Sequence, residues 1–387
     1  MTRKILTGLI LFLLFACQSE SKNQSDKIVV GAERMSEYLD ILKGKSIGLV
    51  VNQSSLVGTT HLVDTLLSEG INISKIFTPE HGFRGDKDAG ELVNDDDAES
   101  TGFTIISLYG KNKKPTPEAL SGIDIMVFDL QDVGVRFYTY ASTMHLVMEA
   151  CAQNNIPMIL LDRPNPNGHY IDGPILDPQF RSFVGMHEIP VVHGLTLGEL
   201  AQMINGEKWL EGGVQTALQV ITLENYNHQT SYSLPIKPSP NLPNDQSIAW
   251  YPSLCFFEGT VISIGRGTVF PFQVAGYTDP EFGTFTFTPE SIEGMASNPK
   301  LLGKQCFGVD LRNSVPPSKL DLSYLIHYYN LFENKEKYFI SYFNTLAGTD
   351  QLRIQIEQGM SEEEIRKSWQ QGLDDYRIKR KIYLLYP

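Results

Sequence analysis

The chain lacks an excess of basic residues and has few cysteines. Its 387 residues carry a formal net charge of −13, and no segment concentrates lysine and arginine into a basic stripe. Proteins that bind nucleic acid present such a stripe to the phosphates, so we expect no nucleic-acid partner. Beyond Cys17, the cysteines are Cys151, Cys255 and Cys306. Their number is odd, their spacing does not suit a metal, and their neighbours are apolar, which together predict three small buried side chains.

Several catalytic motifs are also missing. The first strand-like run is followed by "NQSSLVG" instead of a G-x-G-x-x-G fingerprint, and "GRGT" at 265–268 is too short to be one. A nicotinamide-dependent oxidoreductase is therefore disfavoured, and no cofactor is predicted. The chain has no G-x-S-x-G elbow, which argues against a serine hydrolase. "HEIPVVH" at 187–193 contains a proline and has the wrong spacing for a zinc helix, so no metal is predicted.

One apolar run stands out, at 5–16, and it is too short to span a bilayer as a helix. It follows Arg3 and Lys4, which is the arrangement of a secretory signal peptide. The run ends in "LFAC", which resembles a bacterial lipobox whose cysteine, here Cys17, becomes the lipidated first residue. We expect a signal peptide at 1–17, a polar tether at 18–27, and a lipoprotein of the cell envelope that faces the periplasm or the cell surface. An ordinary or uncleaved signal peptide is the alternative.

The next part of the chain alternates two kinds of segment. Apolar, β-rich runs lie at 46–51, 73–77, 103–109, 124–130, 157–162 and 217–224. Between them, 61–70, 139–155 and 196–210 carry apolar residues at helical spacing. Strands that are apolar on both faces and alternate with helices predict a parallel sheet covered on both sides. The fold class is therefore α/β, with a Rossmann-like domain over 28–235.

The composition changes after about residue 228. "LPIKPSPNLPNDQSIAWYP" at 234–252 is rich in proline and asparagine, which predicts an extended connector. The rest combines short β-like runs at 260–265, 283–289 and 306–311 with helical patterns at 321–334 and 361–383. We expect a smaller α+β domain over 236–387.

Polar segments follow three of the predicted strands. In open parallel sheets, ligands bind beyond the carboxyl ends of the strands, so these segments predict a pocket. They contain Glu80, His81 and Arg84; Asp129, Gln131, Asp132 and Arg136; and Asp162, Arg163, Asn165 and Asn167. Structural explanations remain open. Asp162 and Arg163 can form an ion pair that only stabilises the fold, and the two asparagines can simply shape a turn.

These segments also carry a family resemblance. The motifs are "TPEHGFRG", "FDLQDVGVRFYTY", "LDRPNPNG", "VVHGLTLGELA" and "FFEGT", and their order spans nearly the whole chain after the tether. The chain resembles the bacterial exo-β-N-acetylmuramidases, a NamZ-like family long catalogued as a domain of unknown function. The resemblance implies a Rossmann-like catalytic domain, a smaller C-terminal domain and an active-site cleft between them. It also implies release of N-acetylmuramic acid (MurNAc) from the non-reducing end of peptidoglycan fragments.

Glycosidic cleavage needs a general acid and a second group that acts as base or nucleophile. Glu80 is the expected acid, with His81 tuning its protonation, and Asp132 is the expected second carboxylate. Glu91, Asp162 and Glu258 are held in reserve, and the N-acetyl group of the substrate can replace a protein nucleophile.

Recognition of MurNAc requires a positive charge near its lactyl carboxylate, and Arg136 is the first candidate, before Arg163 and Arg84. The expected substrate-binding residues are Arg84, Arg136, Tyr138, Asp162, Arg163, Asn165 and Glu258. The alternative function is a lipid-anchored muropeptide- or sugar-binding protein without catalysis.

Overall fold

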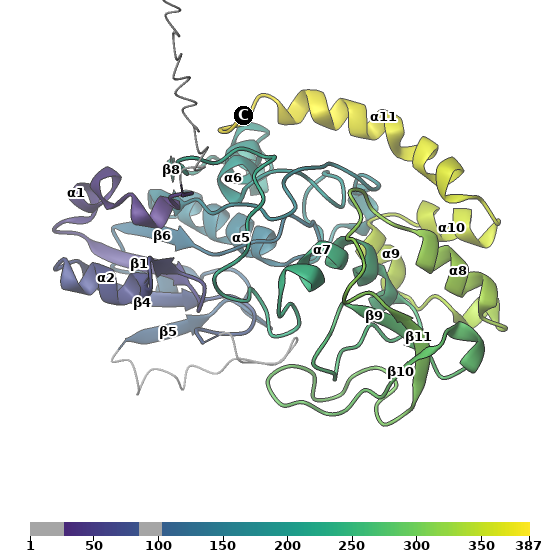
Figure 1. Ribbon diagram of the computed structural model, residues 1–387. Helices are drawn as coiled ribbons and strands as arrows, with labels where there is room; N and C mark the ends of the chain where they lie inside the picture. The colour runs from purple at the N-terminus through teal and green to yellow at the C-terminus, as the bar shows by residue number, and fades with distance from the viewer. Residues whose placement is uncertain (1–26, 85–102) are drawn as a thin grey trace, which may run out of the picture.

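The computed structural model describes residues 27–84 and 103–387, and its N-terminal half is built on a parallel sheet (Figure 1). The six strands lie in the order β5-β4-β1-β6-β7-β8. Their bounds are β1 (Ser46–Val51), β4 (Asn72–Thr78), β5 (Thr104–Ser107), β6 (Ile125–Asp129), β7 (Met158–Leu161) and β8 (Leu218–Ile221). All five pairings are parallel. The predicted strands and the predicted α/β class are confirmed.

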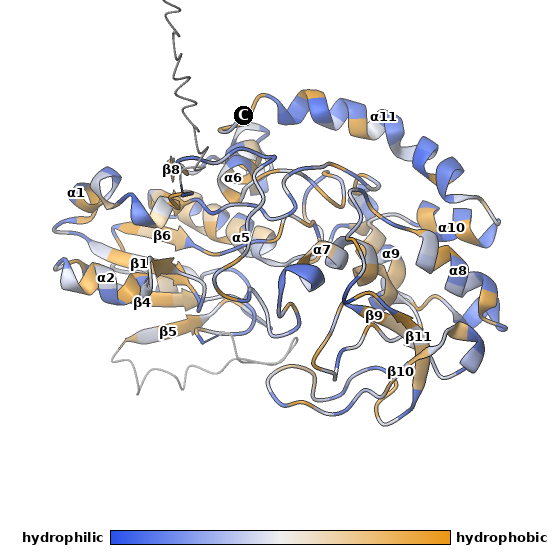
Figure 2. Ribbon diagram, in the orientation of Figure 1, coloured by the Kyte–Doolittle hydropathy of each residue, from blue (hydrophilic) through white to orange (hydrophobic). Residues whose placement is uncertain are grey.

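Both faces of this sheet are buried, because successive side chains of a strand point to opposite faces. Leu49 of β1 belongs to a core that includes α1 (Leu39–Leu42) and α2 (Leu62–Ser68). Its neighbour Val50 belongs to the core formed with α4 (Pro117–Leu120), α5 (Tyr140–Gln153) and α6 (Leu197–Gly206). Figure 2 shows these strands mostly in the orange of hydrophobic residues, beside helices of mixed colour. The helices predicted at 61–70, 139–155 and 196–210 are therefore present.

The C-terminal half contains a smaller antiparallel sheet with the order β10-β11-β9. Its strands are β9 (Val274–Tyr277), β10 (Phe285–Phe287) and β11 (Cys306–Asp310). Four helices follow it in the chain, namely α8 (Ser323–Leu331), α9 (Tyr342–Ala347), α10 (Gln351–Glu357) and α11 (Glu362–Arg380). Helix α11 runs back across the molecule toward α6 (Figure 1), and Tyr376 within it donates a 2.8 Å hydrogen bond to the carbonyl of His193.

Short elements complete the structure. A hairpin of β2 (Leu56–Val57) and β3 (Thr60–His61) follows β1. The remaining helical turns are η1 (Gly31–Glu33), η2 (Met35–Glu37), η4 (Pro178–Phe180), η5 (Glu211–Gly213), η6 (Cys255–Gly259), η7 (Pro280–Phe282) and η8 (Lys335–Lys337). No helix in the described part of the chain is long and apolar enough to cross a membrane.

Two predictions for the second half are wrong. The segment 234–252 is not extended throughout, because its end forms α7 (Asp245–Leu254). Asn244 starts this helix by accepting a hydrogen bond from the Ser247 amide, since asparagine favours helix caps as much as turns. The β-like run 260–265 contributes isolated bridges, at Thr260 and Ser263, and no strand. The sequence also did not indicate β9, α9 or α10.

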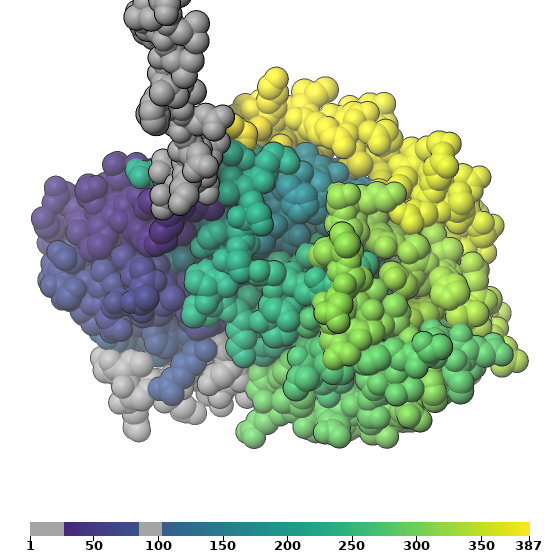
Figure 3. Space-filling model, viewed as in Figure 1, coloured from purple at the N-terminus to yellow at the C-terminus, as the bar shows by residue number. Residues whose placement is uncertain are grey.

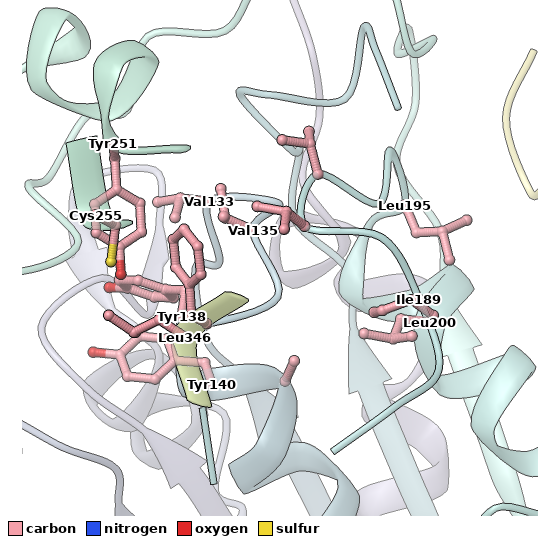
Figure 4. Close-up of a cluster of buried hydrophobic side chains, with 14 of the residues drawn as sticks. Val133, Val135, Tyr138, Tyr140, Ile189, Leu195, Leu200, Tyr251, Cys255 and Leu346 are labelled. Atoms are coloured by element: carbon pink, nitrogen blue, oxygen red, sulfur yellow. The ribbon is translucent and has the colours of Figure 1, made fainter. Parts of the chain in front are cut away.

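One hydrophobic cluster connects the two halves. Tyr138 and Tyr140, which follow β6, pack with Tyr251 and Cys255 and with Leu346 of α9 (Figure 4). The rings of Tyr138 and Tyr251 lie 6.1 Å apart in an edge-to-face arrangement. In the space-filling view the N-terminal half, coloured purple to teal, and the C-terminal half, coloured green to yellow, lie against each other (Figure 3). The predicted buried free cysteines are confirmed at Cys151, Cys255 and Cys306.

Candidate active site

A cavity of about 500 Å³ lies where the carboxyl ends of β4 and β6 face the C-terminal half. Both halves of the chain supply its walls. Its polar and charged lining residues include Glu80, His81, Tyr109, Lys113, Tyr138, Thr139, Ser239, Asn241, Glu258, Arg266 and Tyr342. Of the predicted site residues, the structure therefore brings four together here: Glu80, His81, Tyr138 and Glu258.

Glu80 is held by the turn that follows β4. His81 and Gly82 both adopt φ of 73°, which is rare for a residue with a side chain such as histidine. The Gly82 amide donates to the Pro79 carbonyl over 3.1 Å and closes the turn. Glu80 Oε2 accepts a 2.8 Å hydrogen bond from the Thr139 hydroxyl at the start of α5. The tight turn and this bond together fix a half-buried carboxylate on the cavity wall.

Glu258 approaches the same cavity from η6. Its Oε1 lies 2.6 Å from Nε and 2.5 Å from Nη2 of Arg266. Lys300 is close by and donates from Nζ to the carbonyls of Phe257 and Thr260, and burial lowers its pKa to about 8. Glu258 is therefore a carboxylate whose position is set by a guanidinium.

Tyr342 of α9 is near both carboxylates. Burial raises the pKa of its hydroxyl well above the usual value, and the charges of Glu258 and Glu80 act in the same direction. The two glutamates thus line one small cavity, although they come from opposite halves of the chain. Nothing in the sequence around Tyr342 indicated a site. Arg266 lies in "GRGT", a segment whose only visible pattern was a dinucleotide fingerprint that is too short.

Asp132 is buried and is not among the described residues that line the cavity. Its Oδ1 accepts a 2.6 Å hydrogen bond from the Gly134 amide, whereas its buried Oδ2 has no hydrogen-bond partner in the described structure. Burial raises the pKa of Asp132 to about 7. Burial, and to a smaller extent the negative charge of Asp132, raises the pKa of the hydroxyls of Tyr138 and Tyr140. The geometry therefore favours Glu258 over Asp132 as the second carboxylate.

Arg136 does not reach the cavity, which corrects the expectation that it binds the substrate carboxylate. It is 2% exposed, and its guanidinium donates to four carbonyls, those of Pro174, Ile189, Leu346 and Ala347. Gly348 leaves room for it, because a Cβ there would lie 2.5 Å from Nη2. Burial lowers the pKa of Arg136 to about 9. Its role in the structure is to connect the segment after β6 to α9.

The polar segment after β7 also serves the fold. Asp162 accepts hydrogen bonds from the Thr196 hydroxyl, the Gly198 amide and the Tyr386 hydroxyl, which anchors α6 and the C-terminal tail. Burial raises the pKa of Asp162 to about 6. Asn165 donates to the Leu195 carbonyl and accepts from the Asn167 amide. The contacts of Asp162 and Asn165 thus fit the alternative that the segment after β7 stabilises the fold and does not bind a ligand.

Arg163 forms an ion pair, but with a partner other than the expected Asp162. Its Nε and Nη2 lie 2.5 and 2.8 Å from the carboxylate of Asp129. It lines a different cavity, of about 750 Å³. Arg84 is exposed and is not among the described residues that line the 500 Å³ cavity, and Glu91 lies outside the described residues.

Comparisons with known proteins match the whole architecture. Residues 47–246 match the family model "Exo-beta-N-acetylmuramidase NamZ, N-terminal", and residues 249–386 match its C-terminal counterpart. The chain is 38% identical over 417 residues to the peptidoglycan beta-N-acetylmuramidase NamZ of Bacillus subtilis (strain 168), covering 98% of each chain. Two crystal structures of DUF1343 family proteins from Bacteroides fragilis are similar at 46% and 30% identity, with TM-scores of 0.86 and 0.79. Each alignment covers 93% of this chain and 99% of the other.

Proposed function

The chain belongs to the exo-β-N-acetylmuramidase NamZ family, and from this membership we infer that it is an exo-acting glycoside hydrolase. It releases MurNAc from the non-reducing end of peptidoglycan fragments. The observation that carries this function is the pairing of Glu80 and Glu258 in one cavity, because most glycosidases use two carboxylates on either side of the scissile bond.

The surroundings of the two carboxylates suggest their roles. Glu258 accepts charge-assisted hydrogen bonds from the Arg266 guanidinium, so its Oε1 already has cationic donors. Glu80 accepts from a neutral hydroxyl, that of Thr139. Glu80 therefore donates the proton to the leaving oxygen, and Glu258 acts as base, nucleophile or electrostatic partner of the substrate N-acetyl group. The anomeric configuration of the MurNAc first released, followed by NMR, distinguishes inversion from retention.

The cavity also offers contacts for a sugar. Tyr138 provides an aromatic wall, and Asn241 provides an oriented amide. Asn241 Nδ2 donates to the Met295 carbonyl over 2.7 Å, which fixes the direction of the amide group. Its Oδ1 is then left without a partner in the described structure. Because an unpaired buried carbonyl oxygen is costly, Asn241 is the proposed acceptor for the N–H of the acetamido group.

The cellular location remains a proposal that rests on the N-terminal sequence, since residues 1–26 lie outside the described residues. In this proposal residues 1–17 direct export, Cys17 carries the lipid, and the enzyme is an envelope lipoprotein attached to a membrane. Metabolic labelling with a radioactive fatty acid tests it. Wild-type protein should be labelled and Cys17→Ala should not, whereas equal labelling would exclude Cys17 as the lipidated residue.

The direct test of activity uses the purified protein without its leader. It is incubated with MurNAc-GlcNAc, and free MurNAc is measured by chromatography. We expect MurNAc to accumulate with the wild-type protein and much more slowly with Glu80→Gln. Saturable binding without release would instead support the sugar-binding alternative. On a longer glycan chain, internal fragments that appear before free MurNAc would contradict exo-action.

A further inference from the structure

The catalytic cavity holds two lysine or arginine side chains among its described lining residues, Lys113 and Arg266. They differ in what they already bind. Arg266 forms a close ion pair with Glu258, so its charge is largely balanced. Lys113 has no ion-pair partner among the described residues, whereas the adjacent Lys114 pairs with Glu149 over 2.6 Å. Lys113 is therefore the cation available to a ligand in this cavity.

The loop after β5 positions Lys113. Glu149 belongs to α5 and is 6% exposed, so its bond with Lys114 anchors the loop to the buried core. Lys113 is half-buried, and its Nζ lies 4.5 Å from the ring centroid of Phe183, which also lines the cavity. A cation above an aromatic face is held electrostatically, yet its N–H donors can still meet an acceptor. The ammonium group is thus oriented beside the cavity before a ligand binds.

The charges of the cavity require such a group. The protein carries a net charge of −13, and the cavity itself contains the carboxylates of Glu80 and Glu258. MurNAc differs from N-acetylglucosamine by its lactyl ether, which ends in a carboxylate. A carboxylate bound in such a cavity is disfavoured in its ionised form unless a cation compensates its charge. Because the positive charge of Arg266 is already taken by Glu258, the lactyl carboxylate needs a further cation.

We propose that Lys113 binds the lactyl carboxylate of MurNAc and thereby selects MurNAc over sugars without this charge. This proposal rests on the proposed function. It assigns to Lys113 the part expected of Arg136, whose guanidinium is committed to main-chain carbonyls. The lactyl group is attached away from the anomeric carbon, so Lys113 contributes to binding in the ground state and in the transition state alike. The loss on mutation should therefore appear in KM more than in kcat.

The test compares two substrates that differ only in charge. One is an aryl MurNAc glycoside, and the other is the same compound with its lactyl carboxylate converted to the carboxamide. Wild-type protein should prefer the acid by roughly ten- to a hundredfold in kcat/KM, the range expected for a hydrogen bond to a charged group. Lys113→Met keeps the aliphatic chain and removes the charge, so it should abolish most of this preference. Lys113→Arg should retain part of it.

Lys111→Met is the matched control, because Lys111 is exposed on the same loop and does not line the cavity in the described structure. It should keep the wild-type preference. Equal losses on both substrates with Lys113→Met, or an unchanged preference, would overturn the proposal while leaving the hydrolase function intact. If wild-type protein cleaved neither substrate, the proposed function would fail. Calorimetric binding of MurNAc and its carboxamide to the same variants would then still decide whether Lys113 selects the charge.

Discussion

The assignment of Glu80 as general acid makes a prediction that depends on the leaving group. Glu80→Gln replaces the carboxyl group with a carboxamide of the same shape. The new side chain can still accept the Thr139 hydrogen bond that Glu80 accepts at 2.8 Å. Glu80 is half-buried and forms no ion pair in the described structure, so the substitution leaves no charge without its partner. We expect a change in unfolding free energy within about 0.5 kcal/mol.

The expected kinetic loss is large for a natural substrate. The sugar that leaves MurNAc-GlcNAc is a poor leaving group and needs a proton in the transition state. General acid catalysis is worth ~10²–10⁴-fold, so kcat on the disaccharide should fall by that factor. A nitrophenyl MurNAc glycoside departs as a stabilised phenolate and needs little protonation. The loss on the aryl glycoside should therefore be roughly tenfold or less.

The assay measures kcat for both substrates with wild-type protein and with Glu80→Gln, alongside thermal unfolding of each. Glu188→Gln is a suitable control, because Glu188 is a half-exposed surface carboxylate outside the lining of the described cavity. A folded Glu80→Gln variant with near-normal activity on the disaccharide would refute the role of Glu80. Equal losses on the two substrates would refute its role as an acid, and would place Glu80 on the base or nucleophile side of the reaction.

Three further predictions follow from the same geometry. Glu258→Gln should reduce kcat by a similar factor on both the disaccharide and the aryl glycoside, and a large difference between them would identify Glu258 as the acid instead. Arg136→Met should lower the unfolding free energy by several kcal/mol in a urea titration, because the buried carbonyls of Pro174 and Ala347 lose their donor and that of Ile189 loses one of two; unchanged stability would contradict this structural role. For Asp132, burial raises the pKa from the ordinary value of 3.8 to about 7, so the folded state binds a proton that the unfolded state releases as the pH rises between these values. Stability should therefore decline from about pH 4 to pH 7, and urea titrations of Asp132→Asn should show a flatter pH dependence; identical slopes would mean that Asp132 is ionised in the folded protein.

Part of the site could be predicted from the sequence, because the position of Glu80 and His81 follows from the arrangement of the parallel strands. Glu80 and His81 come directly after a β-rich run, and the carboxyl ends of parallel strands meet at one edge. A polar turn there predicts a ligand pocket regardless of the rest of the fold. Glu258 entered only through the motif "FFEGT", since its helical turn has no sheet strand to place it. Lys113, Arg266 and Tyr342 gave no usable signal, because their loops and helix are ordinary in composition.

The polar residues after β6 and β7 show that a position at the end of a strand does not by itself predict that a side chain lines the cavity. Asp132, Arg136, Asp162 and Arg163 all follow strands of the sheet, yet none of them is among the described residues that line the candidate cavity. Each is bound instead by a buried partner, and several partners are distant in sequence. Leu346 and Ala347 lie more than 200 positions from Arg136, at separations of 210 and 211 residues.

The periodicity of apolar residues by itself determined the strands, the helices on both faces and the edge at which a pocket forms, because that pattern depends on local geometry and burial. Which polar side chain faces the pocket was decided only when the C-terminal half packed against the sheet. A buried guanidinium or carboxylate must find its hydrogen-bond partners or pay a large desolvation penalty. Arg136 therefore turns toward the carbonyls that α9 brings to it, while Glu80 and Glu258 line the cavity together with their partners Thr139 and Arg266.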